Sequence, residues 1–327
     1  MARLYRVLAL LLPLLALTVI VFGAYVRLSD AGLGCPDWPG CYGRLTVPEG
    51  QADVHLEHPD WSTRPLEAGK AWREMIHRYL ASTLGLGIVV LAALAWRRRH
   101  ERRASPVVYL LVPLVVFQGL LGMWTVTLLL KPLVVTAHLL GGLTTLALLW
   151  WHYLGQASPG PVAAAPRPLH VAAGAALAVL ALQIFLGGWT SANYAALACT
   201  DFPTCHGRWW PETDFGEAFV LWRGLGVNYE FGVLDTPART AIHVAHRLGA
   251  ALTALTVLAV ALGALGSGLP RLRRVGWCIL AALLAQLVLG ITNVLGGLPL
   301  AVAVAHNGGA AVLMLSLVTL LHLTRRI

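Results

Sequence analysis

The chain has 327 residues, of which 57% are hydrophobic and only 12% charged, and its mean hydropathy is +0.70. A soluble protein cannot bury that much apolar surface, so the composition excludes a soluble globular fold and indicates an integral membrane protein. The formal net charge of +9 could suggest a nucleic-acid partner. However, the basic residues gather between apolar runs, which indicates membrane orientation and gives no reason to expect nucleic acid.

Eight apolar runs are long enough to cross a bilayer as helices, which takes ~20 residues each. They lie near residues 7–27, 71–96, 106–130, 133–154, 169–191, 239–264, 275–295 and 300–323. The alternating pattern of barrel strands is absent. The sequence therefore predicts an all-α integral membrane fold with eight transmembrane helices.

Basic residues are concentrated in the connections on one side of these helices. The segments concerned are the N-terminus with Arg3 and Arg6, residues 97–103, Arg167, residues 271–274 and residues 325–326, and together they contain a single acid, Glu101. Cytoplasmic loops of membrane proteins carry such an excess of Lys and Arg. We therefore expect a multi-pass protein of the cytoplasmic (inner) membrane with both termini in the cytoplasm.

The sequence repeats itself. Each of the loops "CPDWPGC" (35–41) and "CTDFPTC" (199–205) begins twelve residues after a glycine, Gly23 or Gly187, and is followed by a helix that opens with a His-Arg pair. Later in each half, a glutamine precedes a histidine by twenty residues. We expect two pseudosymmetric four-helix bundles as parallel repeats, 1–160 with an outer loop at 28–70 and 161–327 with an outer loop at 192–238.

Four histidines are expected at one depth, each about six residues inside the outer end of an even-numbered helix: His77, His138, His246 and His306. At ~1.5 Å per residue this depth is on the order of 9 Å below the outer surface. Two imidazoles facing each other across a four-helix bundle suit the axial positions of a haem iron. Two histidines per bundle fall short of the usual zinc or copper set. His243 competes with His246; the His-Arg match favours His246, and the choice stays open.

Glu74 stands three residues before His77, at the position that His243 occupies in the second half. A carboxylate on that helix face is placed to take or give protons beside a porphyrin. The alternative is an interfacial glutamate paired with a neighbouring arginine. Two interpretations of Arg78 and Arg247 also stay open, contacts with haem propionates or extension toward the lipid headgroups.

Two cysteine pairs, Cys35 with Cys41 and Cys199 with Cys205, face the oxidising side, where disulfides persist. Prolines in each loop favour turns that bring the Cα atoms within ~6 Å. The pairs are interpreted as structural disulfides, with a redox-active dithiol as the alternative. The fifth cysteine, Cys278, is interpreted as a small core residue.

Two further features lie near the outer ends of the spans. Trp189 is grouped with other tryptophans at span ends as an interfacial anchor. The segment 212–230 is partly amphipathic, so we expect it to lie on the membrane surface or to cover the second pocket.

Five stretches carry a resemblance to a known family: "RLSDAGLGCPDWPGC", "EMIHRYLAS", "TAHLLGG", "AIHVAHRLGA" and "VAHNGG". With them the chain resembles, over essentially its whole length, the haem A synthases of bacteria and mitochondria. The resemblance implies that His77 and His138 hold the substrate haem and that His246 and His306 hold a resident haem b. It also implies that Glu74 matches the family's functional glutamate.

The implied reaction is oxidation of the C8 methyl of haem O to a formyl group by successive hydroxylations, giving haem A for cytochrome oxidases. The implied partners are a haem O synthase and an electron acceptor or donor; a homo-oligomer is left open. One departure is that the long second outer loop resembles members without the cysteine pairs, which this chain has. The rival functions are a di-haem b electron-transfer cytochrome and a haem carrier or transporter.

Overall fold

The structure, a computed structural model, describes residues 2–51, 53–54, 65–99, 106–157, 160–162 and 165–325. In these residues eight helices are long and apolar enough to cross a membrane: α1 (Ala2–Leu28), α3 (Ala68–Arg97), α4 (Val107–Thr127), α5 (Pro132–Ala157), α6 (Arg167–Ala192), α8 (Thr236–Gly266), α9 (Pro270–Leu295) and α10 (Leu300–Thr324). The short helix α7 (Phe215–Ala218) lies in the second outer loop. The predicted all-α membrane fold with eight spans is confirmed.

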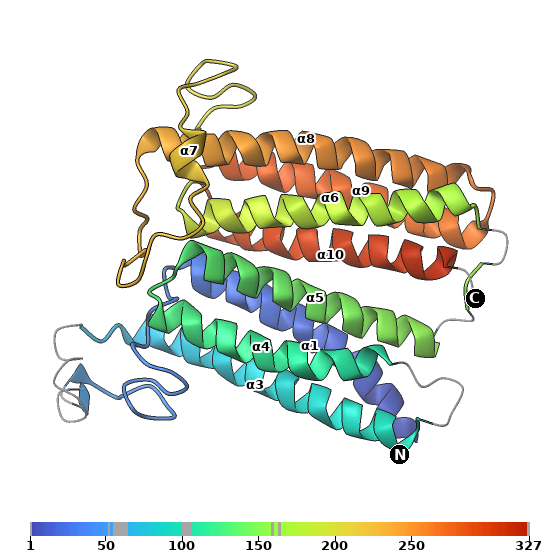
Figure 1. Cartoon of the computed structure of the whole chain (residues 1–327), viewed down its shortest axis with the longest axis horizontal. Coiled ribbons are helices and arrows are strands. Elements are labelled where there is room, and N and C mark those ends of the chain that lie inside the picture. The colour runs from blue at the N-terminus through green and yellow to red at the C-terminus, as the bar shows by residue number, and fades with distance from the viewer. Residues whose placement is uncertain are drawn as a thin grey trace.

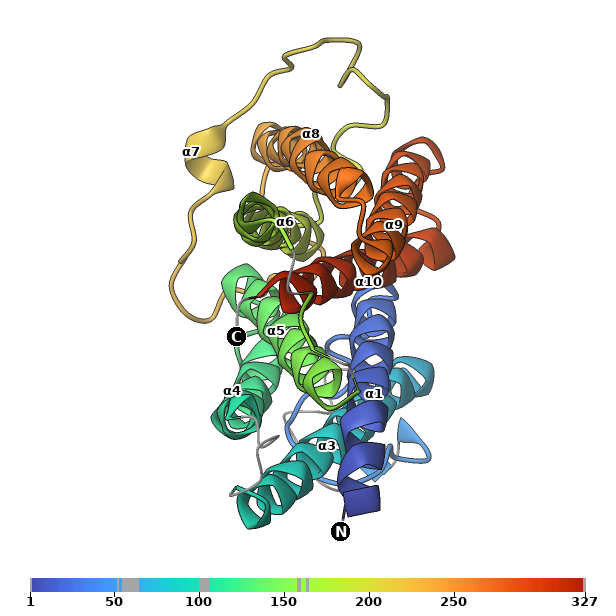
Figure 2. The same ribbon diagram turned by 90° about the vertical axis from the view of Figure 1, so that its right-hand side faces the viewer.

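The long helices lie side by side in two groups (Figure 1). Helices α1, α3, α4 and α5 pack together, as do α6, α8, α9 and α10, while α10 meets α1 and α5, and α6 meets α5, across the boundary (Figure 2). Both termini lie at one end of the helices, and the long loops with α7 lie at the other (Figure 1). Residues 100–103 and 326, used above for orientation, lie outside the described residues. The pseudosymmetry and the division at residue 160 stay predictions.

Helix ends differ from the predicted spans where the local chain has its own signal. Helix α4 stops three residues early because Leu129 and Leu130 adopt φ angles of 52° and 60°, in the left-handed region. Pro132, whose fixed φ suits a first helical position, then opens α5. Helix α8 begins three residues early because the Asp235 carboxylate caps it, accepting a hydrogen bond from the N–H of Ala238 at 3.0 Å.

The core is one apolar cluster that runs through both helix groups, with members such as Leu12, Leu146 and Leu317. Because lipid is as apolar as these side chains, close packing and not water exclusion holds such helices together. Cys278 is exposed on the outer surface of α9, so its interpretation as a core residue is wrong. Every face of a membrane helix is apolar, and hydropathy therefore does not tell a core face from a lipid face.

Candidate functional site

The four histidines that were predicted to share a depth come from four different helices: His77 on α3, His138 on α5, His246 on α8 and His306 on α10. The rings of His77 and His138 lie within electrostatic range of each other, and so do those of His246 and His306. Each helix group therefore holds one pair of imidazoles from two different helices that interact electrostatically.

Each of these rings rests against a glycine on a helix packed beside it. The pairs are His77 with Gly23, His138 with Gly122, His246 with Gly187 and His306 with Gly290. A Cβ built on the glycine would approach the ring Cε1 to 2.8 Å at Gly23, to 3.2 Å at Gly187 and Gly290, and to 3.6 Å at Gly122. Only a glycine leaves the ring undisturbed at the three closer positions, so the helix spacing itself fixes where these rings lie.

The chemistry of this donor set fits a haem iron. The Nδ1 atoms of His77, His138 and His306 are buried and have no hydrogen-bond partner among the described residues. An imidazole that has a ring nitrogen without a hydrogen bond is free to ligate a metal through that nitrogen. Among the residues described, no group of three or more His, Cys, Asp and Glu side chains is arranged so that it could hold a metal ion. Two imidazoles per helix group match the two axial positions of a haem and supply no protein-only metal cage.

Glu74 lies one turn from His77 toward the outer end of α3 and is only 4% exposed. One carboxylate oxygen accepts a hydrogen bond from the backbone N–H of Cys35 at 2.9 Å, and the other lies 2.6 Å from Nη2 of Arg78. Of the two interpretations made from the sequence, the structure contains the pairing with Arg78. The carboxylate is thus fixed to Arg78 and to the first cysteine loop, one helical turn from His77.

Arg78 and Arg247 hold the two cysteine loops. Arg78 donates to the carbonyl oxygen of Gly40, and Arg247 donates to those of Thr204 at 2.8 Å and Asp201 at 2.7 Å. Backbone carbonyls of the cysteine loops are therefore partners of both guanidinium groups, and Arg78 also pairs with Glu74. Extension toward the lipid headgroups stays a prediction. Contacts with haem propionates stay a prediction.

His243 takes the place of Glu74 in the second half. The backbone N–H of Cys199 donates to Nδ1 of His243 at 3.3 Å, as the N–H of Cys35 does to Glu74. His243 is therefore bonded to the cysteine loop, whereas His246 is the histidine that rests on a helix glycine. This geometry supports His246 as the member of the second imidazole pair.

Both predicted cysteine pairs are disulfide-bonded in the structure. Cys35 is bonded to Cys41, with 4.8 Å between their Cα atoms. Cys199 is bonded to Cys205, with 4.9 Å between their Cα atoms, and Cys205 is 3% exposed while the other three cysteines are fully buried. The pairing agrees with the interpretation of Cys35, Cys41, Cys199 and Cys205 as structural disulfides. The redox-active dithiol stays a hypothesis.

An aspartate stabilises each disulfide loop from inside. Asp37 accepts the N–H of Tyr42 at 2.6 Å, and Asp201 accepts that of His206 at 2.7 Å. Hydrogen bonds from the Thr204 hydroxyl and the surrounding backbone hold the pKa of Asp201 below its usual range. Each loop thus has an aspartate that accepts backbone N–H bonds, and an arginine of the helix beneath that bonds its carbonyls.

The segment after α7 reaches across to the first helix group, and we call residues 219–234 the outer strap (Figure 2). Lys131, at the start of α5, donates to the carbonyl of Gly224 and lies 3.4 Å from the ring centroid of Trp222. The N–H of Tyr229 donates to the carbonyl of Leu129 at 3.0 Å. The strap is therefore docked on the first group, which neither prediction for this segment included.

Trp189 anchors the beginning of this strap. Its side chain is 2% exposed, its indole N–H donates to the carbonyl of Ala218 at 2.9 Å, and its ring stacks between Phe185 and Phe219. The interpretation of Trp189 as an interfacial anchor is therefore wrong. A tryptophan at a span end has the same sequence signature whether it faces headgroups or an outer loop.

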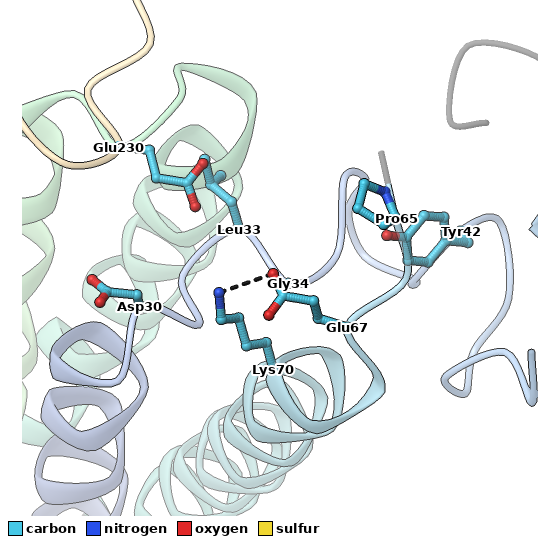
Figure 3. A pocket seen from close by; sticks show the side chains of 8 residues that line it. All are labelled: Asp30, Leu33, Gly34, Tyr42, Pro65, Glu67, Lys70 and Glu230. Atoms are coloured by element: carbon cyan, nitrogen blue, oxygen red, sulfur yellow. Dashed lines mark hydrogen bonds and ion pairs between the residues drawn. The ribbon is translucent and has the colours of Figure 1, made fainter. Parts of the chain in front are cut away.

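Strap and first outer loop meet at a small crevice of about 10 Å³ that contains charged side chains (Figure 3). Glu230 of the strap lies there with Asp30, Glu67 and Lys70, and the Lys70 ammonium donates to Glu67 at 2.9 Å. The crevice has room for a water molecule and not for a porphyrin. It is a seam between two outer segments.

Comparison with known proteins assigns the chain to a family. The model of the COX15-CtaA family, described as cytochrome oxidase assembly protein, matches residues 6–318. The chain belongs to this family. It is 45% identical to a protein of Shewanella oneidensis named heme A synthase. The identity is measured over 307 residues, which are 93% of this chain and 92% of that protein. A heme A synthase of Rhizorhabdus wittichii is 28% identical over 336 residues, 94% of this chain and 90% of that protein.

For this COX15-CtaA chain, sequence reasoning found the histidines and the glutamate but missed what surrounds the rings. It missed that Gly122 and Gly290 contact the rings of His138 and His306. A signal was present, because Gln118, Gln183 and Gln286 each precede by four residues a glycine on which a histidine ring rests.

Proposed function

We propose that the chain is a heme A synthase, an enzyme of haem A biosynthesis that oxidises the C8 methyl of haem O to a formyl group. Membership of the COX15-CtaA family and 45% identity to a protein of that name support this function. The observation that carries the proposal is an asymmetry between the two imidazole pairs. A buried carboxylate, Glu74, lies one helical turn before His77 of the first pair, and an imidazole, His243, lies at the matching place before His246 of the second.

The two pairs have different roles in this proposal. His77 and His138 hold the substrate haem O in the first helix group, and His246 and His306 hold a resident haem b in the second. The resident haem, when bound, supplies one-electron transfer. The glycines beneath the rings keep the imidazoles in place, and the packed helices exclude water from them.

Glu74 moves protons in this scheme. Conversion of a methyl to a formyl group takes its oxygen from one water molecule and releases four protons, together with four electrons that pass to the electron acceptor. Glu74 is the carboxylate placed one turn from a substrate-binding histidine. Arg78 and the N–H of Cys35 hold one oxygen each. These bonds orient the carboxylate toward one position, as a general base requires.

We further propose the setting of this reaction. The chain lies in the cytoplasmic membrane with both termini in the cytoplasm, so that the cysteine loops face the oxidising side. A haem O synthase delivers the apolar substrate within the membrane, and a membrane or periplasmic electron acceptor removes the electrons.

Single histidine variants test the assignment. In membranes supplied with haem O, His77→Ala and His138→Ala are expected to abolish haem A formation and to retain haem b. His246→Ala and His306→Ala are expected to remove the low-spin spectrum of the resident haem. Haem A formation by both first-pair variants would contradict the substrate assignment, and an unchanged low-spin spectrum in both second-pair variants would contradict the other.

A further inference from the structure

Two glutamines contact the histidines of the second pair from neighbouring helices. Nε2 of Gln183 on α6 donates to the backbone carbonyl of His246 at 3.0 Å and lies 3.1 Å from its Nδ1. Nε2 of Gln286 on α9 donates to the carbonyl of His306 at 2.9 Å and lies 3.2 Å from its Nε2. One carboxamide therefore touches both the backbone and the ring of each histidine.

A glycine lies three residues after each of these histidines, and its missing side chain leaves the space that the glutamine occupies. A Cβ on Gly249 would collide with Gln183, and a Cβ on Gly309 would collide with Gln286. Any other residue at these two positions would push the carboxamide away from the helix. Glutamine and glycine thus form one unit, which the chain contains at both histidines of the second pair.

Neither histidine of the first pair receives the side-chain bond of such a glutamine–glycine unit. The residue four positions before Gly23 is Val19, and the residue three after His77 is Leu80, so neither a glutamine nor a glycine is present there. Beside His138, Gln118 enters at Gly141 with its Nε2 toward the glycine, and this Nε2 has no hydrogen-bond partner among the described residues; in Gln183 and Gln286 the unpartnered atom toward the glycine is Oε1. His138 is hydrogen-bonded to the backbone of Gln118, but in the described residues neither histidine of the first pair receives a bond from a glutamine side chain of the kind seen at His246 and His306.

We infer that Gln183 and Gln286 are positioning residues that lock the second pair of imidazoles by a side-chain bond that neither histidine of the first pair receives. This inference rests on the proposed function, in which all four histidines are haem ligands. A donor that fixes a ligand's backbone and ring sets the direction of the ring and strengthens retention of the bound group. The second site therefore retains its haem, and the first site releases its haem after reaction, as a site for substrate and product requires.

The test compares haem loss from glutamine variants of the full chain. Gln183→Met and Gln286→Met keep the side-chain volume and remove the donor, and Gln118→Met is the matched control, because its Nε2 makes no bond to remove. Each protein is purified with haem b, and transfer of the haem to excess apomyoglobin is followed together with the low-spin spectrum and the midpoint potential. Each second-pair glutamine is tested separately, so one variant that does not fold leaves the other to decide.

We expect Gln183→Met and Gln286→Met to speed loss of the resident haem about tenfold, equivalent to ~1.4 kcal/mol, and to shift its midpoint potential. We expect Gln118→Met to leave that rate within about twofold of the unchanged protein, since removing no bond costs little. Wild-type rates and potentials in both second-pair variants would overturn the inference. The His246→Ala variant separates failure of the proposed function from failure of this inference. If it retains the low-spin haem, the assignment of His246 as a ligand is wrong. If it loses the haem while the glutamine variants behave as wild type, only the inference about the glutamines is wrong.

Discussion

The contact between Gly23 and His77 gives a graded prediction. In Gly23→Ala the new Cβ would lie 2.8 Å from Cε1 of His77, whereas carbon atoms in contact prefer about 3.5–4.0 Å. The ring must therefore move by about 0.8 Å, and functional groups tolerate a misplacement of only about 0.5 Å. At Gly122 the same substitution leaves 3.6 Å to the ring of His138, so no movement is needed.

Overall stability should change little in either variant. Overpacking costs about 1–3 kcal/mol, and replacing a mid-helix glycine by alanine returns about 0.5–1 kcal/mol. The clashing atom belongs to a side chain that can turn, so the ring and not the backbone gives way. We therefore expect Gly23→Ala to fold and yet to weaken haem binding at the first pair at least about tenfold, which corresponds to 1.4 kcal/mol.

The assay is a haem titration of the purified protein, with the optical spectrum recorded at each addition. Gly122→Ala is the matched control, and Gly187→Ala and Gly290→Ala, each with 3.2 Å to its ring, should fall between the two. Equal haem affinity in Gly23→Ala and Gly122→Ala would refute the argument that these glycines set the ring positions.

Three further predictions concern the outer end of the molecule. Glu74→Gln should lower haem A formation at least about 100-fold with haem still bound, as loss of a general base does; normal haem A yield in membranes would contradict its role. Replacing Cys35 and Cys41 by serine should cost roughly 2 kcal/mol for so short a loop, seen as a lower unfolding temperature; an unchanged temperature would show that the disulfide does not stabilise the loop. Lys131→Met should release the outer strap and raise protease cleavage within residues 219–234 several-fold; unchanged cleavage would mean that the other strap contacts suffice.

The sequence predicted the spans well because a membrane helix is defined by its own composition. Eight apolar runs became eight helices, and the errors at their ends came from local signals, such as the left-handed pair Leu129 and Leu130 that ends α4. The histidines could be recognised because the two halves of the sequence can be aligned. Their separation into two pairs agrees with that alignment.

Contacts between distant segments could not be predicted. Lys131 and Gly224 are 93 positions apart, and no sequence pattern at either residue indicates that the two are in contact. Arg78 and Arg247 bond the cysteine loops through backbone carbonyls, which every residue possesses, so a sequence pattern does not reveal these contacts. The interpretation of Cys278 as a core residue was wrong for a different reason, because a lipid-facing position and a core position have the same hydropathy.

The most direct test of the central claim is to extract and separate the non-covalent haems from the full chain, purified from cells that also supply haem O. Two imidazole pairs with different roles predict haem b together with haem O, haem A or a hydroxylated intermediate. Haem b alone, at about two per chain as two equivalent bis-histidine sites would hold, would contradict the claim and make the chain an electron-transfer cytochrome.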